Sequence, residues 1–505
     1  MNRHDTSGEP SVRTREFAGL AAISVVALLL RLPGLGASFY GDEGFSLLRD
    51  TNAWLTPTDD RFRPVYFTLL YLWKQIGFHG EVGLRSLSLL FGVLQIPVGY
   101  ALGRRLAGRR FAVAIALLLC VDPILVEFSQ ELRMYSLVAL IALLQAWAFV
   151  VATARQAEGR STLGPWLCFV LAGVVGIYTH LHYWFLLVGF GLAILRRRAI
   201  VLRPGVAAMA GIVAAYLPDV PNVIRFGHEG GEQAHLMATD LPSALPKLLV
   251  AFLVGFNYPQ LPDMGLDRAI RSSVLGPNLG LAILAGVPVL VIGVKLARMC
   301  VSRRPGPAVW LGIELFAVPV AASFAVAAVT HRNFIHPKYM VFSAPFLAVA
   351  VAAGFLALGR RVSQVVGAMG AATLLVAYVH FLQPDRYGRR EDWRGAAEHL
   401  RGAMHADSEL WLVGREPATP CTGRAATTLW EYYAPDLCSR TRYVLPPAPG
   451  VGRGDLFYLW WEVARNFDDP QDTVLTAARA SLTGEERLQL EPRLVLYHWR
   501  AAATQ

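Results

Sequence analysis

Residues 17–50 read FAGLAAISVVALLLRLPGLGASFYGDEGFSLLRD, an apolar run that ends at Arg31 and is followed by a glycine-rich turn and an acid pair. An apolar segment approaching 20 residues is long enough to cross a bilayer. Similar runs recur along the chain, and Pro277–Val294 is one of them. Charged residues make up only 17% of the 505 residues, against about 25% in a soluble domain. The sequence therefore predicts a polytopic membrane protein.

About eleven segments are predicted to cross the membrane, although several are shorter than the roughly 17 residues that a spanning helix needs. They are residues 16–36, 84–103, 111–126, 134–153, 165–180, 182–195, 205–217, 277–297, 309–329, 339–358 and 365–382. The expected architecture is mainly α-helical. It comprises a cytoplasmic N-terminus, a transmembrane domain with two long outer loops, and a soluble C-terminal domain, over residues 1–15, 16–382 (loops 37–83 and 218–276) and 383–505.

The net charge of +10 belongs to the membrane part, because the chain from Gln383 onward contains 15 basic and 17 acidic residues. Upstream, arginines gather in short loops between the predicted spans, which is the pattern that keeps loops in the cytoplasm. This distribution gives no support for nucleic-acid binding. The same distribution places residue 42 and the C-terminal domain on the extracytoplasmic side of the membrane. The Arg-, Ala-, Gly- and Val-rich composition suggests a bacterial source, and hence the cytoplasmic (inner) membrane.

The C-terminal segment alternates a helical pattern at Asp392–Met404 with strand-like runs at Glu409–Val413, Leu456–Trp460 and Leu494–Trp499. It is therefore expected to form a small α/β domain. Its two cysteines, Cys421 and Cys438, are predicted to form a disulfide if the domain is extracytoplasmic. Upstream, Tyr66–Phe78 is apolar and aromatic but too short to span, which favours a helix lying along the membrane interface.

Asp42 and Glu43 stand just beyond the outer end of the first predicted span. A carboxylate there can accept a proton from a substrate hydroxyl or orient a cation. Alternatively, both acids cap the helix that follows, since acids favour helix N-termini. Arg31, at the end of the apolar run, either extends to the headgroups or forms a salt bridge that organises the acid loop.

Three further stretches place cationic or aromatic side chains at the outer ends of spans. Arg133 and Tyr135 in SQELRMY suit a phosphate, although interfacial arginine and tyrosine are common in membrane proteins. His180 and His182 in YTHLHYWF are either substrate contacts or interfacial residues of a tight turn, and their spacing disfavours a two-histidine metal site.

The third stretch is a short outer loop that is rich in donors, namely His331, Arg332, His336 and Lys338. It fits an anionic ligand such as a lipid phosphate, or anchoring to anionic headgroups. The membrane helices themselves contain few acids, chiefly Asp122 and Glu314 near span ends. That scarcity argues against a proton- or ion-coupled transporter, which needs ionisable groups near the midplane.

Taken in order, these motifs resemble the polytopic GT-C glycosyltransferases, and in particular the glycosyltransferase 39-like group of protein O-mannosyltransferases and lipid A aminoarabinose transferases. The matching elements are Arg31-Leu32, Asp42-Glu43, RPVYFTLLYLW at 63–73, RSLSLLFG at 85–92, SQELRMY at 129–135 and HPKYMVFSAPF at 336–346. The resemblance covers most of residues 20–380. One departure is that many relatives have His-Pro-Pro where this chain has Phe62-Arg63-Pro64.

The resemblance implies a GT-C fold, a polyprenyl-phosphate sugar donor and transfer with inversion to an extracytoplasmic acceptor, either lipid, polysaccharide or protein. Asp42 would be the general base, with Glu43 orienting it, binding a cation or capping the next helix. The residues expected to bind the donor phosphate or substrate are Arg31, Arg85, Arg133, Tyr135, His180, His182, His336, Lys338 and Tyr339. Any metal requirement, such as a divalent cation, stays open. The competing interpretation is a flippase or transporter of lipid-linked sugars.

Overall fold

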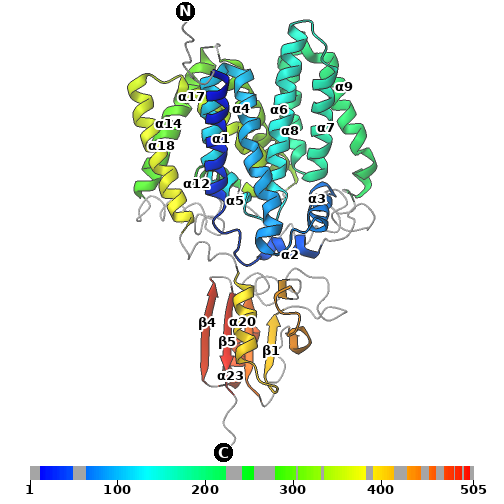
Figure 1. Cartoon of the computed structure of the whole chain (residues 1–505), viewed down its shortest axis with the longest axis vertical. Coiled ribbons are helices and arrows are strands. Elements are labelled where there is room, and N and C mark those ends of the chain that lie inside the picture. The colour runs from blue at the N-terminus through cyan, green and yellow to red at the C-terminus, as the bar shows by residue number, and fades with distance from the viewer. Residues whose placement is uncertain are drawn as a thin grey trace, which may run out of the picture. The chain divides into compact units, whose positions relative to one another are not determined.

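The computed structural model of the chain describes residues 12–48, 64–222, 224, 241–254, 279–302, 305–330, 335–382, 391–413, 429–430, 432–444, 454–461, 471–482, 484–491 and 494–500. The chain divides into two compact units (Figure 1). Unit 1 comprises Met1–Pro33, Ala53–Leu70 and Arg85–Val379, and unit 2 comprises Gly34–Asn52, Tyr71–Leu84 and His380–Gln505. Unit 2 therefore groups two segments of the predicted first outer loop with the C-terminal part of the chain.

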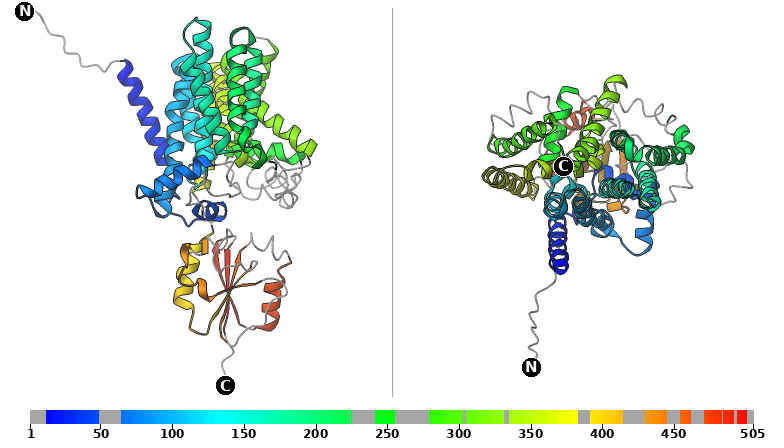
Figure 2. Two further views of the ribbon diagram at one scale, coloured as in Figure 1. Left: turned by 90° about the vertical axis from the view of Figure 1, so that its right-hand side faces the viewer. Right: turned by 90° about the horizontal axis from the view of Figure 1, so that it is seen from above.

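Unit 1 is a bundle of helices (Figure 2). In chain order its helices are α1 (Val12–Arg31), α4 (Gly80–Val121, whose first turn belongs to unit 2), α5 (Pro123–Phe128), α6 (Tyr135–Ala157), α7 (Leu163–Thr179), α8 (Tyr183–Arg196), α9 (Arg198–Tyr216), η1 (Leu217–Asp219), α12 (Leu241–Val254), α14 (Leu279–Val301), α15 (Pro307–Gly312), the π-helical η2 (Ile313–Ala317), α16 (Val318–Thr330), η3 (Pro337–Ser343), α17 (Ala344–Leu356) and α18 (Arg360–Phe381). The first predicted span extends to residue 36, but α1 ends at Arg31 because Pro33 and Gly34 follow it.

Helix α4 is two antiparallel helices joined by a tight turn. Its backbone leaves helical geometry at Ala107 and Gly108. On either side of this turn Gly103 lies against Ala112, and Gly99 lies against Leu119. The predicted spans 84–103 and 111–126 therefore lie in separate helices that fold back on one another, although the second helix ends at Val121 and not at residue 126, because Asp122 and Pro123 begin α5.

In the described part of the chain, seven helices are long and apolar enough to cross a membrane. They are Gly80–Val121, Tyr135–Ala157, Arg198–Asn222, Leu284–Val301, Pro307–Thr330, Pro337–Leu356 and Arg360–Val379. Two shorter apolar helices are Leu163–Thr179 and Tyr183–Arg196. The chain is an integral membrane protein, as its composition predicts, and the count of eleven spans stays a prediction.

Unit 2 contains α2 (Gly41–Leu48), α20 (Trp393–Ala403), η4 (Cys438–Arg440), α23 (Thr473–Ser481) and five strands, while α3 (Pro64–Gln75) crosses the boundary between the units. The strands are β1 (Glu409–Val413), β2 (Thr441–Val444), β3 (Leu456–Trp461), β4 (Glu485–Glu491) and β5 (Leu494–Trp499). They form one sheet in the order β2-β1-β3-β5-β4. Strand β1 is parallel to β2 and β3, whereas β5 is antiparallel to β3 and β4.

Helices α20 and α23 cover opposite faces of this sheet (Figure 2), which gives a three-layer α/β domain. Among the residues of unit 2 that the structure describes, four tryptophans are fully buried, namely Trp393, Trp411, Trp430 and Trp499. Such large buried aromatic surfaces stabilise a small domain. The predicted C-terminal α/β domain is confirmed, and β1 and β5 have the predicted bounds.

Candidate functional site

Five of the predicted site residues meet in unit 1, from three separate stretches of sequence. The His182 ring stacks on Tyr339 with centroids 4.9 Å apart, and the His180 ring lies 5.8 Å from Tyr339. His336 lies 5.2 Å from the same tyrosine, while Tyr135 lies 5.9 Å from His180. We refer to Tyr135, His180, His182, His336 and Tyr339 as the ring cluster. The structure thus joins three motifs that the sequence shows only one at a time.

Local backbone geometry orients two of these histidines. His180 ends α7 in an extended conformation, and its Nδ1 accepts a hydrogen bond from the His182 backbone N–H at 3.3 Å. His336 begins η3 in the same way, because its Nδ1 accepts from the Lys338 backbone N–H at 3.4 Å. A neutral imidazole that accepts at Nδ1 carries its proton on Nε2. Both rings can therefore act as donors at Nε2.

Lys338 adds a cation to the ring cluster. Its Nζ lies 5.4 Å from the centroid of the Tyr339 ring, in cation–π range. Lys338, His336, Tyr339 and His182 are half-buried, whereas His180 is only 3% exposed. The ring cluster is thus partly accessible and lies beside a basic side chain, in addition to its own N–H and O–H donors. Such a combination suits a phosphate or another anion.

Arg31 lies elsewhere in unit 1 and is fully buried. Its Nε donates to Ser129 Oγ at 3.1 Å, and its Nη1 donates to the Ala27 and Cys120 carbonyls. Its Nη2 donates to the Leu119 carbonyl at 2.9 Å. Two of these carbonyls belong to the last turn of α4, where the helix dipole favours a cation. Full burial excludes extension to the headgroups. In the described part of the chain the contacts of Arg31 cap a helix, while a salt bridge to the acid loop and a role in donor binding stay predictions.

Gly92 explains why the motif RSLSLLFG ends in glycine. A Cβ built at this position would lie 2.0 Å from Ser129 Oγ and 3.3 Å from Arg31 Nε. No real Cβ makes a contact that short, so only glycine lets Ser129 and Arg31 approach α4 this closely. Arg31, Gly92 and Ser129 come from three of the matched motifs, and the structure brings them to one point.

Arg85 and Arg133 are both buried in unit 1, at 0% and 8% exposure. The Arg133 carbonyl accepts a hydrogen bond from Ser88 Oγ at 3.2 Å, and that hydroxyl lies 3.0 Å from the Tyr66 hydroxyl. This chain of contacts connects the motifs RPVYFTLLYLW, RSLSLLFG and SQELRMY. The role of both arginines in phosphate binding stays a prediction.

The acid pair lies at the start of α2 in unit 2. Gly41 has a φ of +30°, which glycine adopts readily. The Glu43 carboxylate accepts from the Tyr40 backbone N–H at 3.2 Å, while the Glu43 N–H donates to the Tyr40 carbonyl at 2.8 Å. These two reciprocal bonds cap the N-terminus of α2. Glu43 is also fully buried. Asp42 is the next residue after Gly41 in α2, and its side chain lies outside the described residues.

The two acids noted in the membrane helices both have structural partners. Asp122 Oδ1 accepts from the backbone N–H groups of Ile124 and Leu125 at 3.1 and 3.2 Å and so caps α5. Glu314 is 1% exposed and pairs with Arg196 and, at 3.0 Å, with Arg197. Both acids therefore have structural roles, and neither of them indicates an ion-coupled transporter.

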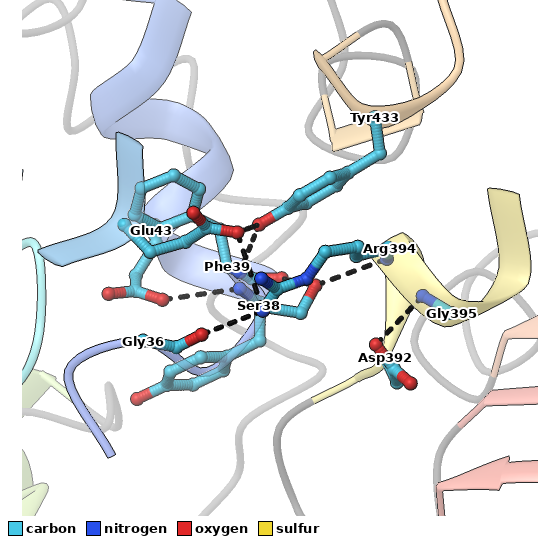
Figure 3. Close-up of polar contacts among 10 residues, drawn as sticks. Gly36, Ser38, Phe39, Glu43, Asp392, Arg394, Gly395 and Tyr433 are labelled. Atoms are coloured by element: carbon cyan, nitrogen blue, oxygen red, sulfur yellow. Dashed lines mark hydrogen bonds and ion pairs between the residues drawn. The ribbon is translucent and has the colours of Figure 1, made fainter. Parts of the chain in front are cut away.

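Sequence reasoning missed the residues of unit 2 that contact the loop before the acid pair, residues 36–41. Tyr433 Oη accepts from the Phe39 N–H at 2.7 Å (Figure 3). It also donates to Glu81 at 3.0 Å. Burial raises the pKa of the Tyr433 hydroxyl well above its ordinary value, and Glu81 acts in the same direction. The hydroxyl therefore stays protonated. No sequence motif marks Tyr433, which lies in the pair Tyr432-Tyr433 far from the acid loop along the chain.

His331, Arg332 and Cys421 lie outside the described residues, so the expectations that rest on them stay predictions. This applies to the Cys421–Cys438 disulfide. Among the residues that can be described, no group of three His, Cys, Asp or Glu side chains is arranged to hold a metal ion.

The chain was compared with known proteins at the level of sequence and of structure. No protein-family model and no curated protein sequence matches it. Among solved structures it is similar to ArnT from Cupriavidus metallidurans in the apo state, with a TM-score of 0.57 and 15% identity over 97% of this chain and 98% of that chain. The same ArnT bound to undecaprenyl phosphate gives a TM-score of 0.55 at 14% identity, over 98% and 99% of the chains.

The apo oligosaccharyltransferase from Archaeoglobus fulgidus is also similar, with a TM-score of 0.50 and 13% identity over 92% of this chain and 68% of that chain. Both proteins are GT-C glycosyltransferases. The predicted GT-C fold is therefore confirmed, since the similarity to ArnT extends over nearly all of both chains.

Proposed function

We propose that this membrane protein transfers a sugar from a polyprenyl-phosphate donor to a hydroxyl of an extracytoplasmic acceptor. The observation that carries the proposal is the ring cluster with Lys338, which gathers donors from three motifs in unit 1. The shared fold with ArnT supports it, since that protein has been solved with undecaprenyl phosphate bound. A donor with a long isoprenoid tail also accounts for an enzyme embedded in lipid.

In the proposed reaction the acceptor oxygen attacks the anomeric carbon while Asp42 removes its proton. The bond between the anomeric carbon and the phosphate oxygen breaks with inversion, and polyprenyl phosphate leaves. Negative charge develops on the phosphate as that bond breaks, so cationic donors lower the barrier. Lys338, His336 and the buried Arg133 are the groups we assign to this role. Glu43 serves the site by capping α2.

Orientation follows from the arginine-rich loops, which we place in the cytoplasm, so that the acid loop and the C-terminal domain face outward. We favour the inner membrane of a bacterium. The acceptor is a lipid, a polysaccharide or a protein.

The proposal can be tested with purified enzyme and a panel of undecaprenyl-phosphate hexoses, pentoses and aminopentoses. Envelope material from a strain that lacks the gene serves as acceptor, and mass spectrometry follows undecaprenyl phosphate and glycan separately. We expect Asp42→Asn to lower turnover about 100-fold or more, since the amide cannot take a proton. Lys338→Met should weaken the preference for undecaprenyl phosphate over undecaprenol in native mass spectrometry.

Full turnover in Asp42→Asn with an inactive Glu43→Gln would move the base to Glu43. Normal glycan transfer in both variants would exclude catalysis by this acid pair. A wild-type protein that moves the lipid-linked sugar across vesicles without releasing undecaprenyl phosphate would establish the flippase instead.

A further inference from the structure

The loop that leads into the acid pair is held by residues that follow it by 350 to 394 positions in the chain. Three residues of the C-terminal segment make the contacts, namely Glu391, Arg394 and Tyr433. All of these residues and the loop belong to unit 2. The contacts end at Gly41, the residue immediately before Asp42.

Glu391 makes the contact nearest to the acid pair. Its Oε2 accepts from the Gly41 backbone N–H at 3.0 Å and from Trp393 Nε1 at 2.9 Å. Glu391 is 1% exposed and Trp393 is fully buried. The indole therefore fixes the carboxylate, which in turn fixes the first N–H of α2. A charged acceptor at a helix N-terminus makes a stronger hydrogen bond than a neutral one.

Arg394 and Tyr433 hold the preceding residues (Figure 3). Arg394 Nη2 donates to the Gly36 carbonyl at 2.7 Å, and its backbone N–H donates to Ser38 Oγ at 3.4 Å. Tyr433 accepts from the Phe39 N–H, as described above. The loop backbone is thus bound at residues 36, 39 and 41 by three different side chains.

Removing a carboxylate from water costs free energy, whereas an apolar residue at position 391 could fill the same space without that cost. A network of charge-assisted bonds to one loop instead restricts where that loop, and the residue after it, can lie. A displacement of about 1 Å in a reacting group can lower a rate about 100-fold. We propose that Glu391, Arg394 and Tyr433 are positioning residues that hold residues 36–41 and thereby orient Asp42 for proton abstraction. This inference rests on the function proposed above.

The first measurement does not depend on activity. Hydrogen exchange followed by mass spectrometry should show faster exchange of residues 36–44 in Glu391→Ala than in the wild type. Exchange of β5 should be unchanged. Glu391→Gln keeps a carbonyl acceptor and should restore most of the protection. The matched control is Glu485→Gln, which removes an ion pair with Arg479 in the same unit without touching the loop.

The second measurement uses the undecaprenyl-phosphate sugar that supports turnover. A positioning role predicts that Glu391→Ala lowers kcat about 10- to 100-fold while the KM for the donor changes less than about threefold. Tyr433→Phe keeps the buried ring and removes only the hydroxyl, so it tests the same role if Glu391→Ala does not fold. We expect it to lower kcat in the same manner.

Unchanged exchange of residues 36–44 in both Glu391→Ala and Tyr433→Phe would overturn the inference, whatever the protein catalyses. Faster exchange with normal kcat in these variants, beside an inactive Asp42→Asn, would also overturn it and would leave the proposed function intact. Normal turnover in Asp42→Asn would instead refute the function proposed for Asp42, and the inference would fall with it.

Discussion

Replacing Gly92 by alanine tests the junction of three motifs in unit 1. The new Cβ would lie 2.0 Å from Ser129 Oγ and 2.7 Å from Ser129 Cβ, so Ser129 must move. Overpacking of this kind costs about 1–3 kcal/mol. Moving Ser129 also breaks its bond with the charged Arg31 donor, which contributes about 1.5–3 kcal/mol. The better helix propensity of alanine offsets about 1 kcal/mol. We therefore expect a net destabilisation of about 1.5–5 kcal/mol.

The assay is denaturant unfolding of purified protein in detergent, in a double-mutant cycle with Ser129→Gly. Removing the serine side chain vacates the space that the new methyl group needs. The double variant should therefore be about as stable as Ser129→Gly alone, rather than showing the sum of both losses. Gly191→Ala is the control, because a Cβ there meets nothing within 4 Å. Gly92→Ala as stable as Gly191→Ala, or strict additivity in the cycle, would refute the close approach.

Three other predictions concern separate features. Arg31→Lys should lower the unfolding temperature, because one ammonium cannot satisfy the acceptors that the three guanidinium nitrogens now bind. The donor KM of the folded fraction should stay near the wild-type value. Loss of donor binding without loss of stability would make Arg31 a substrate ligand. Purified, unreduced protein should resist thiol labelling at Cys421 and Cys438, and labelling of both would exclude the disulfide. The Arg479 guanidinium holds the pKa of Glu485 below its ordinary value, so this pair stabilises unit 2 above about pH 4 and the contribution is lost on acidification. Glu485→Gln should flatten the acid limb of the stability profile, and an unchanged limb would assign it to other carboxylates.

Much of the fold could be predicted because apolar runs and strand patterns are local signals. Strands β1 and β5 are rich in apolar and aromatic residues, and their bounds match the prediction. Strand β4, Glu485–Glu491, was missed because its sequence EERLQLE is dominated by charged and polar residues. Such a composition is typical of an edge strand, and β4 lies at the edge of the sheet.

The candidate site was predictable only in pieces. The motifs around His180 and Lys338 could each be recognised, but nothing local indicates that Tyr339 lies against both His180 and His182. For Arg31 the sequence leaves extension to the headgroups and a salt bridge open, because the partner of a cation in an apolar run is not a local signal. The position of α4 shows that Arg31 donates to the Leu119 and Cys120 carbonyls, and its role in donor binding stays a prediction.

The contact between Phe39 and Tyr433 has a consequence for biogenesis. The two residues are 394 positions apart, so the loop is synthesised long before the side chain that holds it. At about 5–20 residues per second this interval is roughly 20–80 s. During that time the nascent chain carries an acid pair whose surroundings are incomplete. A chain truncated before residue 391 would lack all three side chains that bind this loop. The contacts that hold residues 36–41 can therefore form only after the C-terminal segment has been synthesised.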